Sequence, residues 1–288
     1  MAEISDKDRE EIRREFDQAR GKGSQQQEGP QVFQTAPGSS IKHVIGVVSG
    51  KGGVGKSLVT GALAVELKRA GKKVAILDAD ITGPSIPKMF GMSGARATAT
   101  DERLNPVLSV GGIEVMSINL VLEHETDPVL WRGPMLMGVL RQFFEECNWG
   151  DIDYLLVDMP PGTGDVALTV FQSMPLDGVV IVSSPQDLVQ MVVSKAVNMA
   201  AMMNVPVVGL VENMSWLPCP HCGERVEPFG PSRLKETADY YGIVALDQLP
   251  IDPQIAKSCD EGNFEEVLPE GFVAQAVDQI LAHEELSE

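Results

Sequence analysis

The sequence predicts an α/β fold in which helices cover both faces of a doubly wound, mostly parallel sheet. From residue 43 onward, short β-branched runs alternate with longer segments of helical periodicity, which is the order of successive strand–helix units. The runs are apolar on both faces, as strands are when helices cover a parallel sheet on each side. Ligands of such sheets bind at the carboxyl ends of the strands, so we expect functional residues there.

Each strand run is rich in valine, isoleucine and leucine, and each helical segment repeats its apolar residues at the spacing of one helix face. The predicted strands occupy residues 43–49, 73–78, 113–118, 154–158, 178–183, 206–212 and 243–250. The predicted helices occupy residues 55–70, 133–147, 187–203 and 232–241. All of these elements fall within one predicted domain, residues 41–288.

Residues 1–40 are predicted to be a mobile N-terminal extension. Residues 5–20 have a helix-forming composition but few apolar residues to bury, and the linker-like segment GKGSQQQEGPQ follows them.

The 288-residue chain is acidic, with a formal net charge of -18 at pH 7, and 43% of its residues are hydrophobic. Its negative charge repels nucleic-acid phosphates and anionic lipids, so we expect neither nucleic acid nor a membrane as a partner. No run of 18 apolar residues occurs, and the first 20 residues are charged rather than built as a signal peptide. We therefore expect a cytoplasmic protein. In that reducing compartment, we expect the cysteines to be thiols or metal ligands rather than disulfide partners. They are Cys147, Cys219, Cys222 and Cys259.

A glycine-rich phosphate-binding motif directly follows the first predicted strand. Residues 50–57 match G-x-x-x-x-G-K-[ST] in full, and a helical pattern follows them. Glycines let backbone N–H groups converge on phosphate oxygens, Lys56 reaches the β- and γ-phosphates, and the Ser57 hydroxyl binds Mg²⁺. The predicted nucleotide-binding residues of this loop are Gly50, Lys51, Gly52, Gly53, Val54, Gly55, Lys56 and Ser57. Lys51 has no role in this template, so its charge either serves a phosphate across an interface or adds to the local positive potential.

Aspartates stand at the ends of two predicted strands. Asp78 and Asp80 follow the second strand on one face of an extended segment, and Asp158 ends the strand YLLVD. Magnesium usually keeps several waters, so one carboxylate suits a place near the ion and another can orient the attacking water. For Asp78 a turn-capping role is the alternative. The Gly-rich segment MPPGTGD follows Asp158, and Asp165 within it is either a functional carboxylate or a helix N-cap.

Asn213 directly follows the predicted strand PVVGLVE, as the last residue of the segment VEN. Its amide can both donate and accept hydrogen bonds, as recognition of adenine requires, and a plain turn residue is the alternative.

A cysteine pair, Cys219 and Cys222, forms the knuckle C-P-x-C-G shortly after Asn213. Its proline and glycine shape the turn so that both sulfurs face one centre and backbone N–H groups are free to bond them. Zinc or a 4Fe-4S cluster normally takes four ligands, and no second CxxC exists in the chain. A two-fold symmetric dimer would bring two pairs together and complete four ligands. Cys147 lies in an apolar-rich helix and is expected to be buried.

Six motifs occur in order along the chain: GKGGVGKS, LDADITGPSIPKMFG, WRGPM, DYLLVDMPPGTGD, SSPQD and VENMSWLPCPHCGE. Together they resemble the Mrp/ApbC/Nbp family of iron-sulfur cluster carrier ATPases, which belongs to the MinD-like P-loop NTPases. The resemblance covers roughly residues 41 to 265. The first motif is similar to the deviant phosphate loop of that branch, in which the extra lysine reaches the nucleotide of the partner subunit in a sandwich dimer.

The resemblance implies three catalytic residues. Lys56 acts on the nucleotide of its own subunit, Lys51 acts on that of the partner, and Asp80 positions the attacking water. It also implies that Asp158 lies near Mg²⁺ and that Gly162 senses the γ-phosphate.

For the downstream residues the resemblance implies that Asn213 recognises adenine and that Cys219 and Cys222 are iron-sulfur ligands. The predicted function is therefore an ATP-dependent carrier that binds a 4Fe-4S cluster at a homodimer interface and transfers it to apo iron-sulfur proteins, with slow ATP hydrolysis. Its cofactors are ATP, Mg²⁺ and the cluster.

Two alternatives stay open. In one, CPHC is a structural zinc site that staples a dimer, with His221 as a further ligand. In the other, the protein is a MinD-like positioning switch, which predicts a basic amphipathic C-terminus, whereas residues 270–288 are acidic.

Overall fold

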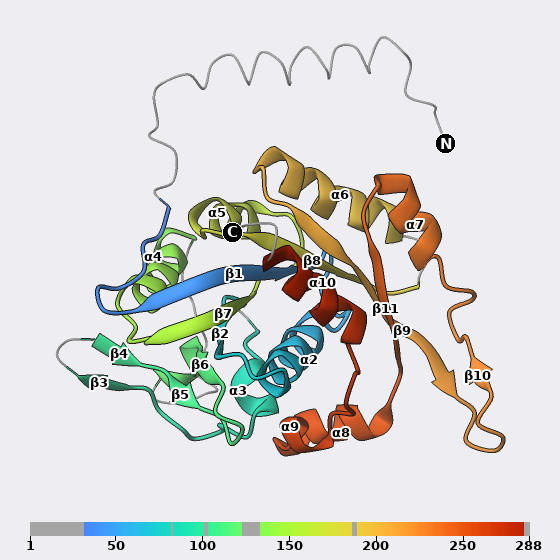
Figure 1. Cartoon of the computed structure of the whole chain (residues 1–288), viewed down its shortest axis with the longest axis horizontal. Coiled ribbons are helices and arrows are strands. Elements are labelled where there is room, and N and C mark those ends of the chain that lie inside the picture. The colour runs from blue at the N-terminus through green and yellow to red at the C-terminus, as the bar shows by residue number, and fades with distance from the viewer. Residues whose placement is uncertain (1–31, 82, 101–102, 123–132, 186–188, 285–288) are drawn as a thin grey trace, which may run out of the picture. The chain divides into compact units, whose positions relative to one another are not determined.

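The computed structural model describes residues 32–81, 83–100, 103–122, 133–185 and 189–284, and these form one α/β body. Its centre is a nine-stranded sheet, drawn in Figure 1. The strands are β1 (Ser40–Val48), β2 (Val74–Asp78), β5 (Val107–Leu108), β6 (Glu114–Met116), β7 (Asp151–Asp158), β8 (Gly178–Ser183), β9 (Val207–Pro218), β10 (Arg225–Val226) and β11 (Ala245–Pro250). All seven predicted strands are confirmed, and so is the fold class.

Strand order follows β10-β9-β8-β1-β7-β2-β6-β5, and β11 also pairs with β9. The pairings are parallel except at the two ends, where β5 runs antiparallel to β6 and β10 runs antiparallel to β9. Strand β7 lies between β1 and β2, so the strand that ends at Asp158 is flanked by the strand before the glycine-rich loop and by the strand that ends at Asp78. This order gathers the predicted nucleotide-site residues that follow β1, β2 and β7 at the carboxyl ends of these strands.

Helices cover both faces of the sheet, and each set packs on its own buried apolar cluster. One face carries α2 (Lys56–Arg69), α3 (Ile86–Met89), α8 (Pro253–Glu261), α9 (Phe264–Val267) and α10 (Ala274–Glu284). The other carries α4 (Gly133–Glu145), α5 (Asp165–Ser173), α6 (Val189–Met202) and α7 (Leu234–Tyr241). The four predicted helices are confirmed as α2, α4, α6 and α7. A short 3₁₀ turn, Ile118–Leu120, and a small hairpin of β3 (Thr98–Thr100) and β4 (Arg103–Asn105) complete the described elements. Among the described helices there is none with the length and apolar character needed to cross a membrane.

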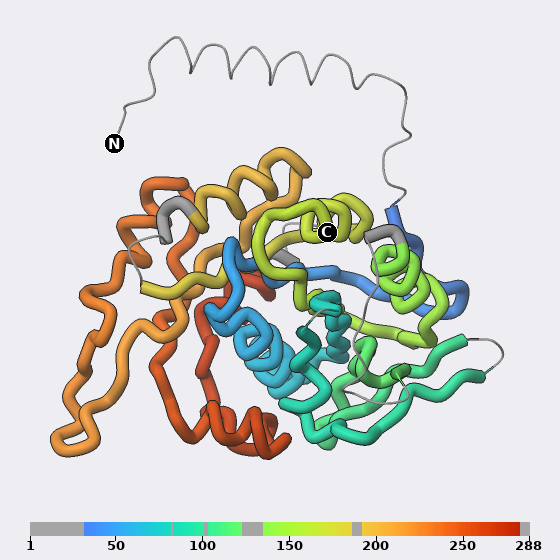
Figure 2. The backbone as a smooth tube through the Cα atoms, turned by 180° about the vertical axis from the view of Figure 1, so that it is seen from behind, coloured from blue at the N-terminus to red at the C-terminus, as the bar shows by residue number. Residues whose placement is uncertain are grey.

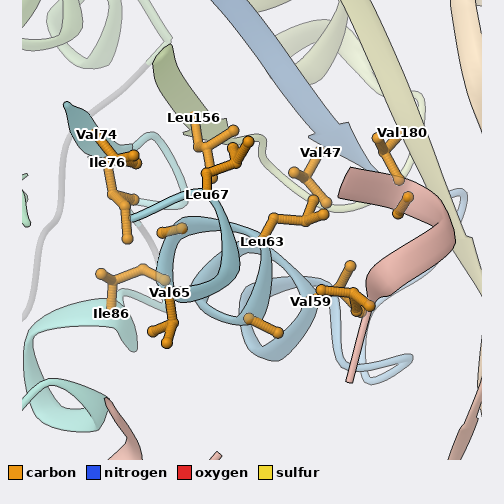
Figure 3. Close-up of a cluster of buried hydrophobic side chains, with 14 of the residues drawn as sticks. Val47, Val59, Leu63, Val65, Leu67, Val74, Ile76, Ile86, Leu156 and Val180 are labelled. Carbon is orange, nitrogen blue, oxygen red and sulfur yellow. The ribbon is translucent and has the colours of Figure 1, made fainter. Parts of the chain in front are cut away.

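Helix α2 is central to one of these clusters. Figure 3 shows its Leu63 and Leu67 pointing toward the sheet, where Val47 and Leu156 belong to the same buried cluster. The helix also carries Gly61, where an added Cβ would lie 2.4 Å from the Met89 side chain and 3.1 Å from the Phe264 ring. Glycine therefore lets α3 and α9 pack closely on α2. The helix that begins at the phosphate-binding motif is thus held from several sides.

The N-terminal residues meet the domain earlier than the predicted boundary at residue 41. Phe33 and Ala36 are buried, and the Phe33 N–H donates to the Ser173 carbonyl at 2.8 Å. The prediction of a mobile extension otherwise concerns residues 1–31, which lie outside the described residues.

One carboxylate of the sheet, Glu114 on β6, lies in an unfavourable environment. Its Oε2 atom is buried and accepts no hydrogen bond from the described residues, and burial raises the pKa of Glu114 to about 7, against the nearby positive charges of Lys68 and Lys73. The folded protein holds this proton up to a higher pH than the unfolded chain does. The stabilising effect of that proton is therefore complete below about pH 4.5, where the unfolded side chain titrates, and is lost as the pH rises through about 7.

Glu114→Gln is therefore expected to raise the melting temperature at pH 8, because the variant carries no charge to desolvate. We expect a rise of about 2–4 °C, the shift that roughly 1 kcal/mol produces in a domain of this size, and almost none at pH 4.5. Thermal unfolding of parent and variant at both pH values measures it. The exposed Glu270→Gln serves as the control, and an equal shift of Glu114→Gln at the two pH values would contradict the assignment.

Candidate functional site

The candidate site lies at the carboxyl ends of three adjacent parallel strands. In the pairing register, Asp158 at the end of β7 stands beside Val47 of β1 on one side and beside Asp78 of β2 on the other. The glycine-rich loop follows β1 directly and leads into α2. Successive parallel strands end at the same edge, so loop and carboxylates converge there.

The loop needs glycine at specific positions. Gly53 and Gly55 have φ values of 79° and 83°, in the left-handed region that glycine adopts without steric cost. An added Cβ at Gly50 would lie 2.4 Å from the Val192 carbonyl oxygen, and one at Gly55 would lie 2.1 Å from the Asn213 side-chain nitrogen. Helix α2 starts at Lys56, so the loop ends at a helix N-terminus, where backbone N–H groups and the helix dipole favour an anion. The predicted phosphate loop has the backbone that phosphate binding requires.

Lys56 is the charged centre of the site. Its side chain is only 6% exposed, and its Nζ lies 2.7 Å from Asp158 Oδ1 and 3.8 Å from Asp80 Oδ2. The Ser57 hydroxyl donates to Asp158 Oδ2 at 2.6 Å. Four residues predicted from three separate motifs are thus brought together. The Ser57 hydroxyl and the Asp158 carboxylate are oxygen donors of the kind that Mg²⁺ takes, so the donor set fits this ion beside a nucleotide phosphate.

Asp78 is fully buried beneath this group. Its carboxylate accepts a hydrogen bond from the Ser117 hydroxyl at 3.1 Å and one from the Asp80 N–H at 3.2 Å. Burial, together with the negative charge of Asp158 beside it, raises the pKa of Asp78 to about 8. The contact with the Asp80 N–H is the turn-capping arrangement that the sequence left as the alternative for Asp78. The capped turn holds Asp80 at the site.

The segment after β7 is hydrogen-bonded to the phosphate loop. Gly162 has a φ of 82°, and its N–H donates to the Ser49 carbonyl at 2.8 Å, while the Ser49 hydroxyl donates to the Lys51 carbonyl at 2.9 Å. Gly162, the predicted γ-phosphate sensor, therefore lies directly beside the start of the loop. Asp165 is the first residue of α5, and Gly164 occupies the N-cap position. Lys51 is half-buried, and its predicted role in a partner subunit concerns a second chain.

Asn213 is used by the protein itself in this structure. The side chain is buried, its Nδ2 donates to the Val54 carbonyl at 2.9 Å, and its Oδ1 accepts from the Met214 N–H at 2.9 Å. Met214 has a φ of 57°, in the left-handed region that non-glycine residues seldom adopt. The sequence did not reveal this contact between β9 and the phosphate loop, and a contact of the same amide with adenine stays a prediction.

The cysteine pair lies at the tip of the β9–β10 hairpin, in which Pro218 pairs with Arg225. Figures 1 and 2 both show this hairpin extending away from the rest of the sheet. The Cys219 N–H donates to the Glu224 carbonyl, and the Gly223 N–H donates to the Cys219 carbonyl, both at 2.8 Å, which closes the turn. Hydrogen bonds from the His221 and Cys222 N–H groups, and then from the Cys222 thiol, lower the pKa of Cys219. Backbone N–H groups therefore do approach a sulfur of the pair, at Cys219, and cluster binding by the pair stays a prediction.

A polar and aromatic network braces the base of the hairpin. The Arg225 guanidinium lies 5.1 Å from the centre of the Trp216 ring and donates to Gln248 Oε1 at 2.6 Å. Gln248 Nε2 in turn donates to the Ser232 hydroxyl at 2.8 Å. These contacts tie β10 to β11 and to the segment before α7. They depend on how the side chains of separate strands pack together, so no periodic pattern in the sequence predicted them.

The other two cysteines lie apart from the hairpin tip. Cys147 is fully buried, as predicted, and burial raises the pKa of its thiol to about 12. Cys259 is half-buried, and burial raises the pKa of its thiol as well. Within the described ranges, no three cysteine, histidine, aspartate or glutamate side chains are grouped to hold a metal ion. The described part of one chain therefore offers two thiols at the tip and no further ligand beside them.

Sequence comparison connects this geometry to known proteins. The model of the ParA family described as NUBPL iron-transfer P-loop NTPase matches residues 40–283. An iron-sulfur cluster carrier protein from Clostridium perfringens is 50% identical over 238 residues, which cover 80% of this chain and 84% of the relative. An iron-sulfur cluster transfer protein NUBPL from Dictyostelium discoideum is 43% identical over 235 residues, covering 81% of this chain and 72% of the relative.

Solved structures show the same fold. A nucleotide-binding protein from Archaeoglobus fulgidus, solved in complex with ADP, has a TM-score of 0.72 and 46% identity, covering 81% of this chain and 91% of that one. The cell division protein MinD from Aquifex aeolicus has a TM-score of 0.55 at 19% identity, covering 85% of this chain and 97% of that one, a likeness of fold alone.

Proposed function

Because the chain belongs to the ParA-type family of iron-transfer P-loop NTPases, we propose that it is an ATP-dependent iron-sulfur cluster carrier. In this proposal, two chains hold one 4Fe-4S cluster between them and transfer it to apo iron-sulfur proteins. One observation carries the proposal: two thiols stand at an exposed hairpin tip, and no third ligand accompanies them in the described chain. Such a pair is half of a four-thiolate site.

The nucleotide half of the proposal rests on the group around Lys56. Its ammonium is positioned to turn from Asp158 toward the β- and γ-phosphates, and Ser57 and Asp158 would hold Mg²⁺. When bound, Mg²⁺ neutralises phosphate charge and orients the γ-phosphate. Asp80, with a side chain 14% exposed and 3.8 Å from Lys56, is placed to orient the attacking water. We propose slow ATP hydrolysis by these residues, with Lys51 contributing its charge to the nucleotide of the partner subunit.

The cluster half rests on the thiols. Thiolates are the ligands that iron-sulfur clusters take, and the N–H groups aimed at Cys219 favour its thiolate. An exposed site at the end of a projecting hairpin suits release to another protein. A dimer with two-fold symmetry brings the hairpin tips of the two chains to one centre, so each chain contributes the same two cysteines to the site. A reducing compartment such as the cytoplasm, which keeps these thiols reduced, remains the predicted location.

Anaerobic reconstitution with iron and sulfide tests the proposal. We expect one 4Fe-4S cluster per two chains, or about two iron atoms per chain, on a protein that has the mass of a dimer. Iron and sulfide analysis measures the cluster content per chain, visible absorption identifies the type of cluster, and light scattering measures the mass of the protein. A full cluster on a monomer would contradict the shared site. Tight zinc binding without iron uptake would favour the structural zinc alternative.

A further inference from the structure

The carboxylate of Asp158 has three side-chain partners. Lys56 Nζ lies 2.7 Å from Oδ1, the Ser57 hydroxyl donates to Oδ2 at 2.6 Å, and the Thr60 hydroxyl donates to Oδ1 at 2.8 Å. Asp158 itself is fully buried. A buried carboxylate depends on such partners, because losing them leaves an uncompensated charge in the interior.

Two of these partners have a second task under the proposed function, on which this inference rests. Lys56 must reach the phosphates and Ser57 must bind Mg²⁺, so both leave Asp158 or share it when nucleotide binds. Thr60 stands one helical turn further into α2 than Lys56 and is fully buried. Its hydroxyl also lies 3.0 Å from the Lys56 carbonyl, the acceptor that a helical threonine commonly uses. Thr60 has no second task of this kind, so under the proposed function its hydroxyl stays available to Asp158 when nucleotide binds.

The need for a permanent partner is increased by Asp78. That residue also stands beside Asp158 in the pairing register, so on that side Asp158 has an acidic neighbour rather than a cation. Without a donor on Oδ1, the Asp158 side chain would be free to turn away from the position in which it faces Ser57.

We propose that Thr60 is a positioning residue, which holds the Asp158 carboxylate in place for Mg²⁺ while Lys56 and Ser57 engage the nucleotide. Thr60 acts through Asp158 and touches neither nucleotide nor metal. It is the fixed member of the group, and Lys56 and Ser57 are the members that change partners.

Thr60→Val tests this role, because valine has the shape of threonine and lacks the hydroxyl. We expect the apparent affinity for Mg²⁺ in the presence of ATP to fall about tenfold, because removing the hydrogen-bond partner of a metal ligand typically weakens metal binding by at least this factor. ATP binding in EDTA should be unchanged. Calorimetric ATP titrations at a series of MgCl₂ concentrations measure both quantities. Thr60→Ser keeps the hydroxyl and is expected to restore Mg²⁺ dependence to that of the parent.

Unchanged Mg²⁺ dependence in a folded Thr60→Val would overturn the proposal. Equal losses in Thr60→Val and Thr60→Ser would overturn it too, because they would assign Thr60 a packing role alone. If Thr60→Val does not fold, Thr60→Ala provides the same comparison with Thr60→Ser. A parent protein that binds no ATP would refute the proposed function itself, whereas a parent with normal binding confines any failure to Thr60.

Discussion

Cys222→Ser is expected to abolish retention of a 4Fe-4S cluster, because in a shared site each substitution removes two of the four thiolates from every dimer. Serine keeps the size of the side chain, but its hydroxyl is a hard ligand that iron-sulfur clusters rarely accept. We expect iron per chain to fall by about tenfold or more after anaerobic reconstitution and desalting, with loss of visible absorption. Cys219→Ser should likewise lose the cluster, since in the shared site it also removes two of the four thiolates from every dimer.

Two controls separate this result from a general effect of thiol loss. Cys147→Ser removes a thiol that is buried in the core, and Cys259→Ser removes one that is half-buried on α8. Both should retain the full iron content, although Cys147→Ser is expected to lower the melting temperature. Undiminished iron in Cys222→Ser would refute the bridging model. ATP affinity should survive in both hairpin variants, because the phosphate loop lies at the ends of other strands.

Lys56→Ala is expected to lower ATP affinity by about a hundredfold or more, the second large effect. The ammonium supplies the charge-assisted contacts to the phosphates. Its removal also leaves the carboxylates of Asp80 and Asp158 without the cation that pairs with both of them. The triphosphate would then approach uncompensated negative charge. Isothermal titration calorimetry with ATP and MgCl₂ measures the loss.

Lys51→Ala is the matched contrast, since it removes the other lysine of the same loop. We expect monomer affinity for ATP to be nearly unchanged, with loss of hydrolysis and of ATP-dependent dimerisation, because the proposed target of Lys51 is the partner's nucleotide. Calorimetry, phosphate release and light scattering separate these properties. Equal loss of monomer affinity in the two variants would show that Lys51 acts within its own subunit.

Much of this fold could be predicted because its strands are buried on both faces and read as continuous apolar runs. The helices that escaped prediction are α5, α8 and α10, together with the single turns α3 and α9. Helix α8, PQIAKSCDE, has few apolar residues, and α5, DVALTVFQS, is rich in β-branched residues. Short helices of this kind are stabilised by tertiary packing more than by their own propensity. Local sequence therefore contains little signal for them.

The contacts of the candidate site also fall into those that the sequence predicts and those that it does not. The approach of Lys56 and Ser57 to Asp158 followed from one topological rule, that adjacent parallel strands end at one edge. The contact of Thr60 with Asp158 and that of Asn213 with Val54 depend on side-chain packing between residues 98 and 159 positions apart. No local pattern encodes such pairs. The brace formed by Arg225, Trp216 and Gln248 is of the same kind.

Strand β9 also limits how this protein can tolerate insertions and deletions. Asn213, whose amide contacts the phosphate loop, and Cys219, at the hairpin tip, lie on one continuous stretch of chain with no loop between them. The six residue steps between them span at most roughly 20 Å, so the spacing of the two sites is set by the count of residues. Adding one residue there would lengthen the segment between the two sites, and removing one would shorten it. Either change would also turn the side chains beyond it to the opposite face of the strand. Protein engineers who lengthen this protein therefore have freedom in its surface loops, but none between these two residues.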